Sequence, residues 1–328
     1  MASPFALFLC FKTTIMSSNE RIIAEYTNNM NGPLLIVLGG IHGNEVAGVK
    51  AIQYVGKMLE VEPITNPDFT YKGNFVGVLG NKKAFQAGQR YLNRDLNRSF
   101  TTENINFVRT MPYSILEDEL QELKELLETV HSLIYKHQPE MLVVLDLHTT
   151  SGGGGIFSIC SDEPESLKIA GELGVPVVTG LLNGVKGTSL SYFNQKNTGV
   201  KTVSIAFESG QHEDPLSVNR AIAFVINCMK IISSVNDNHV ENIHNKILLE
   251  YSSSLPQYSS ILTKYSIKTK GRFRMIPGFS SFQPIRKGQL LAYDGEEAVY
   301  APCDGRILMP LYQSKGEDGF FVVKEENY

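Results

Sequence analysis

Short apolar runs alternate with longer amphipathic segments along the first 240 residues. Five runs rich in β-branched residues have the length and composition of buried strands: residues 34–38, 74–79, 141–147, 175–178 and 202–207. Apolar residues recur at helical spacing in three further segments: residues 45–59, residues 114–134 with a capping box at Ser114–Glu117, and residues 215–232. This alternation predicts an α/β fold in which helices flank a mixed, mainly parallel sheet.

A different pattern begins after about residue 240. Residues 251–328 are rich in Ser, Tyr, Gly and Pro, and turns separate short segments there. The turns fall at Pro277-Gly278, Lys287-Gly288, Asp294-Gly295 and Asp304-Gly305. We therefore expect two domains, a larger α/β domain over residues 1–240 and a small all-β domain over residues 241–328.

The composition is that of a globular protein. Of the 328 residues, 42% are hydrophobic and 20% are charged, which suits a sizeable core and excludes a disordered chain. The formal net charge of −4 gives no electrostatic footprint for nucleic acid or for an anionic membrane surface. No apolar run reaches the ~18 residues that a membrane helix needs. Four widely separated cysteines (Cys10, Cys160, Cys228 and Cys303) indicate reduced thiols and a cytoplasmic location.

One segment near the N-terminus has two interpretations. Residues 4–11 are apolar but short, lack a preceding basic region and are not followed by a small-residue cleavage site. Met16 and the polar residues after it look like an ordinary start, so we interpret residues 1–15 as an upstream extension. A weak signal peptide is the alternative.

The first candidate metal ligands lie in the segment Gly39-Gly-Ile-His-Gly-Asn-Glu-Val-Ala-Gly48. It follows a predicted strand and leads into a predicted helix, so it lies at the carboxyl end of a strand, where open α/β sheets bind ligands. His42 and Glu45 are three residues apart on this turn, so both side chains can reach one metal ion. By itself, a pair with this spacing is more often a surface feature than a site.

A second histidine follows the apolar strand 141–147. His148 lies at the same edge of the predicted sheet, and with His42 and Glu45 it completes a His₂Glu set, which leaves one position of a catalytic zinc open. Asp146 precedes it by two residues and has two interpretations, the orientation of a metal ligand or the capping of a loop.

Candidate catalytic side chains occur in two other segments. Glu208 ends the predicted strand 202–207, where a carboxylate can take a proton from metal-activated water and pass it to a leaving amine. A solvated strand-end glutamate is the ordinary alternative. Residues 89–100 contain Arg90, Arg94 and Arg98 in a polar loop. Arginine beside a zinc ion can stabilise an oxyanion or bind a carboxylate, although an isolated arginine cluster is more often a solvated charged loop.

Four motifs occur together and in a fixed order. They are HGNExxG at 42–48, RYxxxDLNRxF at 90–100, DLHTTSG at 146–152 and FESG at 207–210. Together they resemble the aspartoacylase/succinylglutamate desuccinylase family, which belongs to the wider zinc carboxypeptidase-like group. Each motif is weak alone, but the ordered set is specific and spans most of the first domain.

The resemblance implies a zinc carboxypeptidase-like fold and a zinc-dependent catalytic domain over residues 1–240. It also implies roles for individual residues: zinc on His42, Glu45 and His148, Glu208 as general base and acid, Arg90 polarising the scissile carbonyl, Asn97 and Arg98 holding the α-carboxylate of the substrate, and Asp95 in a supporting role. The implied reaction is hydrolysis of the amide bond of a small N-acyl amino acid, so the chain would be a linear-amide amidohydrolase, or deacylase.

One segment departs from the family. Members that cleave N-acetylaspartate carry a T-T-R-S-like segment whose arginine holds the side-chain carboxylate, whereas the matching stretch Gly187-Thr-Ser-Leu190 has no arginine. An apolar, neutral or larger amino-acid moiety is therefore at least as well supported as aspartate. The C-terminal domain, which lines the substrate channel in the family, matches only in its β-rich character. Tyr312 and Lys315 are candidates for that channel, and His212 is a candidate for the pocket.

Three functions are compatible with these motifs. The preferred one is a cytoplasmic zinc amidohydrolase acting on a small-molecule N-acyl amino acid, without a nucleic-acid or membrane partner and with homo-oligomerisation left open. The nearer alternative is a metallocarboxypeptidase acting on short peptides, and the other is a metal-free binding protein that retains the fold. The metal itself is not fixed, because nitrogen and oxygen ligands bind several divalent ions.

Overall fold

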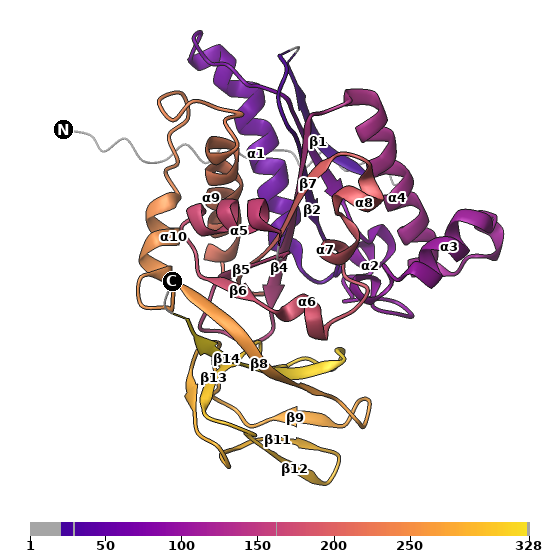
Figure 1. Cartoon of the computed structure of the whole chain (residues 1–328), viewed down its shortest axis with the longest axis vertical. Coiled ribbons are helices and arrows are strands. Elements are labelled where there is room, and N and C mark those ends of the chain that lie inside the picture. Colours follow the sequence, from indigo (N-terminus) through magenta and orange to yellow (C-terminus); the bar gives the residue numbers. More distant parts are fainter. Residues whose placement is uncertain (1–20, 29, 162, 327–328) are drawn as a thin grey trace.

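A large sheet runs through the molecule (Figure 1). The computed structural model describes residues 21–28, 30–161 and 163–326, so the expected extension over residues 1–15 lies outside the described residues. The sheet has eleven strands in the order β1-β3-β2-β4-β7-β5-β6-β8-β14-β13-β10. The first seven along the chain are β1 (Ile22–Thr27), β2 (Leu34–Gly39), β3 (Asn74–Leu79), β4 (Met141–Thr150), β5 (Phe157–Cys160), β6 (Val177–Thr179) and β7 (Lys201–Gln211).

The centre of the sheet is parallel. Strands β3, β2, β4 and β7 run in one direction, with Leu34 of β2 opposite both Asn74 of β3 and Leu142 of β4. The strands β1 and β5 pair antiparallel with β3 and β7. All of β2 and nearly all of β4 are buried, as expected for central strands covered on both faces. These pairings confirm the predicted mixed, mainly parallel sheet.

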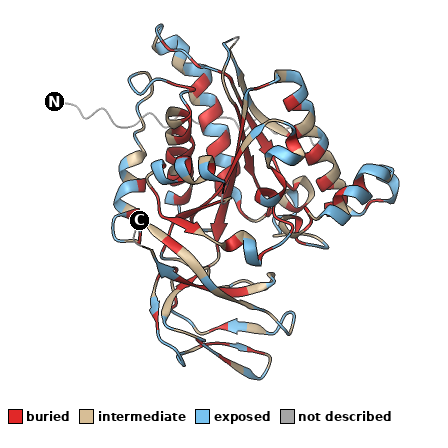
Figure 2. Ribbon diagram, in the orientation of Figure 1, coloured by how far each residue is buried: buried red, intermediate tan, exposed pale blue. Residues whose placement is uncertain are grey.

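Helices cover both faces of this sheet. On one face, α1 (Val46–Thr65) and α9 (Leu216–Ile231) share a hydrophobic core with Leu35, whereas α4 (Asp118–His137) shares the core of the other face with Ile36. Figure 2 shows the buried residues gathered in the strands and on the inner sides of these helices. The shorter helices are α2 (Lys82–Gln86), α3 (Thr102–Thr110), α5 (Pro164–Glu172), α6 (Leu181–Gly184), α7 (Ser189–Tyr192), α8 (Gln195–Thr198) and α10 (Asn245–Ser252), with 3-10 turns at Leu96–Arg98 and Tyr113–Ile115. Within the described ranges, no helix is both long and apolar enough to cross a membrane.

Some local expectations differ from the structure. The capping box at Ser114–Glu117 is wrong, because a 3-10 turn precedes α4 and the Glu117 side chain caps nothing. Leu116 adopts an extended backbone and is buried in the core beneath α4, which keeps this segment out of the helix. The apolar pattern does not predict β1, which is only partly buried, or β5, which has four residues. The strand expected over 175–178 begins at Val177.

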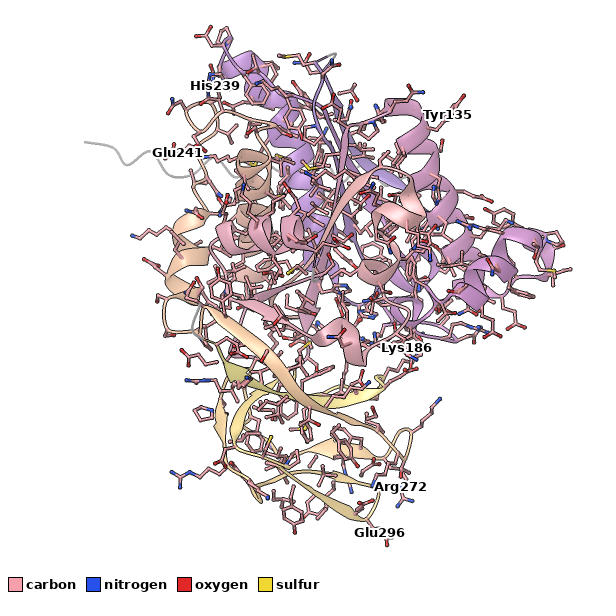
Figure 3. The ribbon with its side chains drawn as sticks, viewed as in Figure 1. Tyr135, Lys186, His239, Glu241, Arg272 and Glu296 are labelled. Carbon is pink, nitrogen blue, oxygen red and sulfur yellow. The ribbon has the colours of Figure 1, made fainter. Side chains whose placement is uncertain are left out.

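The C-terminal part contains the predicted short β-strands. They are β8 (Tyr258–Ser266), β9 (Phe273–Met275), β10 (Pro284–Ile285), β11 (Leu290–Asp294), β12 (Glu297–Tyr300), β13 (Gly305–Leu308) and β14 (Asp318–Glu325). Strands β9, β11 and β12 form a separate antiparallel sheet, whereas β8 pairs in parallel with β6 and continues the large sheet. We call residues 258–326 the small β-unit. Figure 3 shows Arg272 and Glu296 at its end farthest from the α/β part. The domain boundary near residue 240 stays a prediction.

Candidate metal and catalytic site

Three neighbouring parallel strands bring four predicted site residues to one edge of the sheet. His42 and Glu45 follow β2, His148 lies near the end of β4, and Glu208 lies near the end of β7. In the register of β4 and β7, His148 is directly opposite Glu208. Because the carboxyl ends of these strands meet at one edge, residues far apart in the sequence become neighbours.

The turn that carries His42 and Glu45 depends on glycine. Gly40 has a φ of +70°, a conformation that glycine adopts without strain. A β-carbon on Gly43 would lie 2.1 Å from the backbone of Ala84, so this position also excludes a side chain. The turn therefore packs closely against the backbone of Ala84, and the side chains of His42 and Glu45 on it are buried.

Three side chains form a compact set of metal-ligand atoms. The Nδ1 atom of His42 lies 2.8 Å from Oε1 of Glu45, and the Nδ1 atom of His148 lies 2.9 Å from Oε2 of the same carboxylate. One ligand atom from each residue falls within 4.8 Å of the others. Two imidazole nitrogens and a carboxylate oxygen are suitable ligands for zinc.

A second carboxylate lies behind each histidine. The Nε2 atom of His42 is 3.1 Å from Oδ1 of Asp95, and the Nε2 atom of His148 is 3.1 Å from Oδ2 of Asp146. Asp146 in turn accepts a hydrogen bond from the hydroxyl of Ser189. A carboxylate hydrogen-bonded to a metal-bound histidine orients its ring, as Asp95 can do for His42. Asp146 lies equally close to the His148 ring, although Nε2 of His148 forms no hydrogen bond with the described residues. These contacts favour the orienting interpretation of Asp146 over a loop cap.

The electrostatics of the cluster keep Glu45 ionised. Burial alone would raise its pKa, but the attraction of His42 and His148 holds the pKa of Glu45 well below its usual range. Burial likewise opposes protonation of His148, yet Asp146 and Glu45 raise the pKa of His148 well above its usual value. The buried carboxylates of Glu45 and Asp146 therefore favour the charged form of the His148 imidazole between them.

Glu208 has a different environment. It is 8% exposed, and its Oε2 atom forms no hydrogen bond with the described part of the chain. Burial raises the pKa of Glu208 to about 7, although the nearby His148 favours the ionised form. A carboxylate whose pKa lies near neutrality can both accept and return a proton, as a general base that later acts as an acid must do.

Two of the three predicted arginines, Arg90 and Arg98, lie beside these groups, whereas Arg94 is exposed and does not line the site. Arg90 donates from Nη1 to Oε1 of Glu45 at 3.2 Å and from Nη2 to Oδ2 of Asp95 at 3.4 Å. Arg98 donates to Oδ2 of Asp318 at 3.0 Å. The side-chain oxygen of Asn97 accepts a hydrogen bond from the backbone N–H of Ser189 at 2.9 Å. This bond fixes the side chain and leaves its NH₂ group as the donor that can face a ligand.

One cavity, with about 880 Å³ of unfilled space including its mouth, joins these residues. All seven predicted site residues line it: His42, Glu45, Arg90, Asn97, Arg98, His148 and Glu208. Other parts of its wall are apolar and include Ile159, Leu181, Val185, Leu190, Ala206 and Phe321. The structure therefore gathers the predicted residues in one place, next to space suited to an apolar group.

Residues 31–232 match the succinylglutamate desuccinylase/aspartoacylase catalytic domain. The chain belongs to this family. It is 32% identical over 138 residues to a probable aspartoacylase of Nostoc, a match that covers 42% of each chain. It is 33% identical over 148 residues to an N-acyl-aromatic-L-amino acid amidohydrolase of Rattus norvegicus, which covers 42% of this chain and 41% of the relative. The matched regions thus span about two fifths of the length of these relatives.

Solved structures of the family share the fold over most of the chain. A succinylglutamate desuccinylase from Vibrio parahaemolyticus superposes with a TM-score of 0.59 at 15% identity and covers 92% of this chain and 84% of its own. Murine aminoacylase 3 superposes with a TM-score of 0.55 at 20% identity and covers 90% and 96%. The predicted carboxypeptidase-like fold class is thereby confirmed.

The stretch that departs from the aspartate-cleaving members of the family forms part of the cavity wall. Gly187 has a φ of +72° and packs against the backbone of Arg98, and Thr188 caps the short helix α7. Leu190 is 5% exposed and lines the cavity. An apolar side chain therefore lines the cavity in the segment where the resemblance leads us to expect an arginine in aspartate-cleaving members.

Three candidates from the sequence have contacts that the motifs do not reveal. His212 lies beside the site, with its Nδ1 atom 2.7 Å from the hydroxyl of Thr149. The hydroxyl of Tyr312 donates to the backbone carbonyl of Ile276 and accepts from the backbone N–H of Phe279, so it connects parts of the small β-unit. The ammonium of Lys315 donates hydrogen bonds to Gln89 and Tyr91, in the loop that carries Arg90.

The sequence reasoning missed Asp318, which pairs with Arg98. No local pattern identifies it, because its partner lies 220 residues earlier in the chain.

Proposed function

We propose that this protein is a zinc-dependent deacylase that hydrolyses the amide bond of a small N-acyl amino acid. The observation that carries the proposal is the arrangement of the two histidines. Their Nδ1 atoms converge on Glu45, while a buried carboxylate lies behind the other nitrogen of each ring. Two imidazoles oriented toward one carboxylate are typical of a metal site, whereas a structural ion pair does not require that arrangement.

In this proposal His42, Glu45 and His148 hold the metal ion. Bound there, zinc supplies a Lewis acid and lowers the pKa of water toward about 7. Glu208 takes a proton from the attacking water and returns it to the leaving amine. Its position opposite His148, its raised pKa and its free Oε2 atom support this role.

The arginines and Asn97 bind the substrate in this proposal. Arg90, which already contacts Glu45, polarises the scissile carbonyl and stabilises the negative charge that develops on its oxygen. Asn97 and Arg98 hold the α-carboxylate from the neighbouring part of the cavity wall. The substrate is thus fixed at its carboxylate while the amide bond lies beside the metal ligands.

The substrate proposed for this site carries an apolar or neutral amino-acid or acyl moiety. Leu190, Val185 and Phe321 line the cavity beyond the polar residues, and none of them can pair with a second carboxylate. The similarity to relatives named as N-acyl-aromatic-L-amino acid amidohydrolases supports this preference. Relatives named as probable aspartoacylases make N-acetylaspartate the substrate to compare.

The test combines metal content with amine release. We expect about one zinc ion per purified chain, loss of that ion in His148→Ala, and release of free amine from N-acetyl-leucine or N-acetyl-phenylalanine by the zinc-loaded protein. Treatment with a chelator should abolish turnover, and added zinc should restore it. His244→Ala is the matched control, because His244 bonds to Asn219 away from the cavity.

The outcome separates the three candidate functions. Metal-dependent release from N-acyl amino acids supports the deacylase. Release of C-terminal residues from short peptides, without cleavage of N-acetyl amino acids, would replace it with a carboxypeptidase. Protein that neither contains nor takes up a divalent metal would leave a binding protein as the better explanation.

A further inference from the structure

The connection between β13 and β14 lies along the catalytic cavity. We call residues 309–317 the strap. Its residues Met309, Leu311, Gln313 and Glu317 line the cavity, although they belong to the small β-unit. The strap is tied to the α/β part through Tyr312, whose backbone N–H donates to the Ser151 hydroxyl. The small β-unit thus forms one side of the site.

Lys315 connects the strap to the loop that carries Arg90. Its Nζ atom donates to the backbone carbonyl of Tyr91 at 2.6 Å and to the side-chain oxygen of Gln89 at 3.0 Å. The same ammonium lies 4.8 Å from the centre of the Tyr91 ring. Lys315 therefore contacts the residues on both sides of Arg90.

The other contacts of this loop come from the α/β part. Glu119 is 1% exposed, and its carboxylate accepts hydrogen bonds from the backbone of Leu92, Asn93 and Arg94. The carbonyl of Arg90 accepts from the backbone N–H of Gly43, on the turn of the metal ligands. Glu119 thus holds the loop after Tyr91, and the backbone N–H of Gln89 donates to the Ala84 carbonyl at 3.0 Å. Between these two anchors, Arg90 and Tyr91 are held by Gly43 and by Lys315.

We propose that Lys315 is a positioning residue that holds Arg90 in place for catalysis, so that the small β-unit completes the active site. The inference rests on the proposed function, in which Arg90 stabilises charge on the scissile carbonyl. The Arg90 side chain is directed at Glu45 and Asp95 over distances of 3.2 and 3.4 Å, which leaves room for a small displacement to weaken both contacts. A displacement of ~1 Å at a catalytic group can cost up to about 10²-fold in rate.

Lysine suits this position because of its chemistry. An ammonium has three donors and can satisfy a carbonyl and an amide oxygen at once while lying over an aromatic ring. Methionine has nearly the same length and no donor, so Lys315→Met removes the contacts without opening a cavity. Arginine can reach the same acceptors, so Lys315→Arg should retain most of the function.

The experiment is a double-mutant cycle on the zinc-loaded full chain, with steady-state release of amine from an N-acetyl amino acid that the wild-type protein cleaves. We expect Arg90→Ala to lower kcat about 10²-fold or more. Lys315→Met should lower kcat about tenfold with KM within about twofold of wild type, because the ground-state carboxylate is held elsewhere. In the double variant, loss of Lys315 should cause little further decrease, since its effect acts through Arg90.

Controls separate positioning from general damage. Lys268→Met removes an exposed lysine of the same small β-unit, which pairs with Glu297, and should leave kcat unchanged. Thermal unfolding and zinc content should be the same in all variants. If Lys315→Met does not fold, Gln89→Ala removes one acceptor from an exposed position instead and should lower kcat in the same direction by a smaller factor.

Each outcome has a distinct meaning. Wild-type kcat in Lys315→Met, together with low kcat in Arg90→Ala, would overturn the role of Lys315 and leave the proposed function intact. If Lys315→Met lowers kcat by the same factor in the wild-type background and in the Arg90→Ala background, Lys315 does not act through Arg90. Wild-type kcat in Arg90→Ala would contradict the catalytic role of Arg90 itself and remove the basis of the inference.

Discussion

Substitution of Glu208 by glutamine tests the proposed base without changing the size of the side chain. Burial raises the pKa of this carboxyl from its ordinary 4.5 to about 7, with a further contribution from Glu45, while His148 acts in the opposite direction. Because one pKa unit corresponds to about 1.4 kcal/mol, the shift represents about 3 kcal/mol of differential stability in the metal-free protein. A glutamine side chain does not titrate, so the substitution removes this pH-dependent contribution.

The direction of the pH effect follows from proton binding. Between pH 4.5 and about pH 7, the unfolded chain has released the Glu208 proton that the folded chain still holds. The Glu208 contribution to the unfolding free energy is therefore fully present below pH 4.5 and is lost as pH rises through about 7. As pH rises from 4.5 to above about 7, the unfolding free energy of metal-free Glu208→Gln should therefore increase relative to that of wild type by up to about 3 kcal/mol.

Urea unfolding of both metal-free proteins at several pH values measures this difference. The same variant, loaded with zinc, should keep its metal content and lose turnover by about 10²-fold or more. Glu296→Gln is the matched control, because Glu296 is an exposed glutamate at the far end of the small β-unit (Figure 3). A stability difference that does not change with pH would refute the effect of burial on Glu208, and unchanged turnover would refute its role as the base.

Two other substitutions test the cavity wall and the small β-unit. Leu190→Arg should raise the ratio of kcat/KM for N-acetylaspartate over N-acetyl-leucine by about tenfold or more, because it supplies a partner for a second carboxylate, and an unchanged ratio would show that Leu190 does not contact the substrate. Asp294→Asn should lower the unfolding free energy at neutral pH by about 1–3 kcal/mol, because the carboxylate accepts from Lys268, Thr269 and Tyr265. Burial opposes ionisation of Asp294, but these hydrogen bonds hold its pKa below the usual range. The difference in unfolding free energy between wild type and Asp294→Asn, measured by urea unfolding, should therefore become smaller as pH falls through that pKa.

The parallel core was predictable because its strands are apolar along their whole length. Strands such as β2, with every residue buried, stand out in the sequence without any knowledge of their neighbours. Strand β1 is only partly buried and pairs with β3 at the edge of the described sheet, so its pattern is weak. The predicted start of α4 is wrong because Leu116 and Glu117 adopt extended backbone conformations, and a local capping pattern does not contain this information.

The predicted site residues converge for a reason that the sequence contains. Each motif follows a predicted parallel strand or its loop, and the ends of such strands meet at one edge. The resemblance names Lys315 as a channel candidate, but neither its contact with the Arg90 loop nor the pairing of Asp318 with Arg98 was predictable, because both depend on how the small β-unit packs against the α/β part. Lys315 reaches Tyr91 across 224 residues, and its own neighbours in the sequence form no motif.

The charges of the site explain why the histidines and carboxylates belong together. Glu45, Asp95, Asp146 and Glu208 are all buried within one cluster, and Arg90 supplies a single guanidinium that contacts two of them. Buried carboxylates are stable only when cations or hydrogen-bond donors compensate them, and Asp146 and Glu45 correspondingly raise the pKa of His148, which favours its charged form. A divalent ion held by His42, Glu45 and His148 would supply this compensation with the imidazoles neutral and Glu45 ionised. The acidic residues behind the histidines thus favour a cation at the point where the proposed reaction needs one.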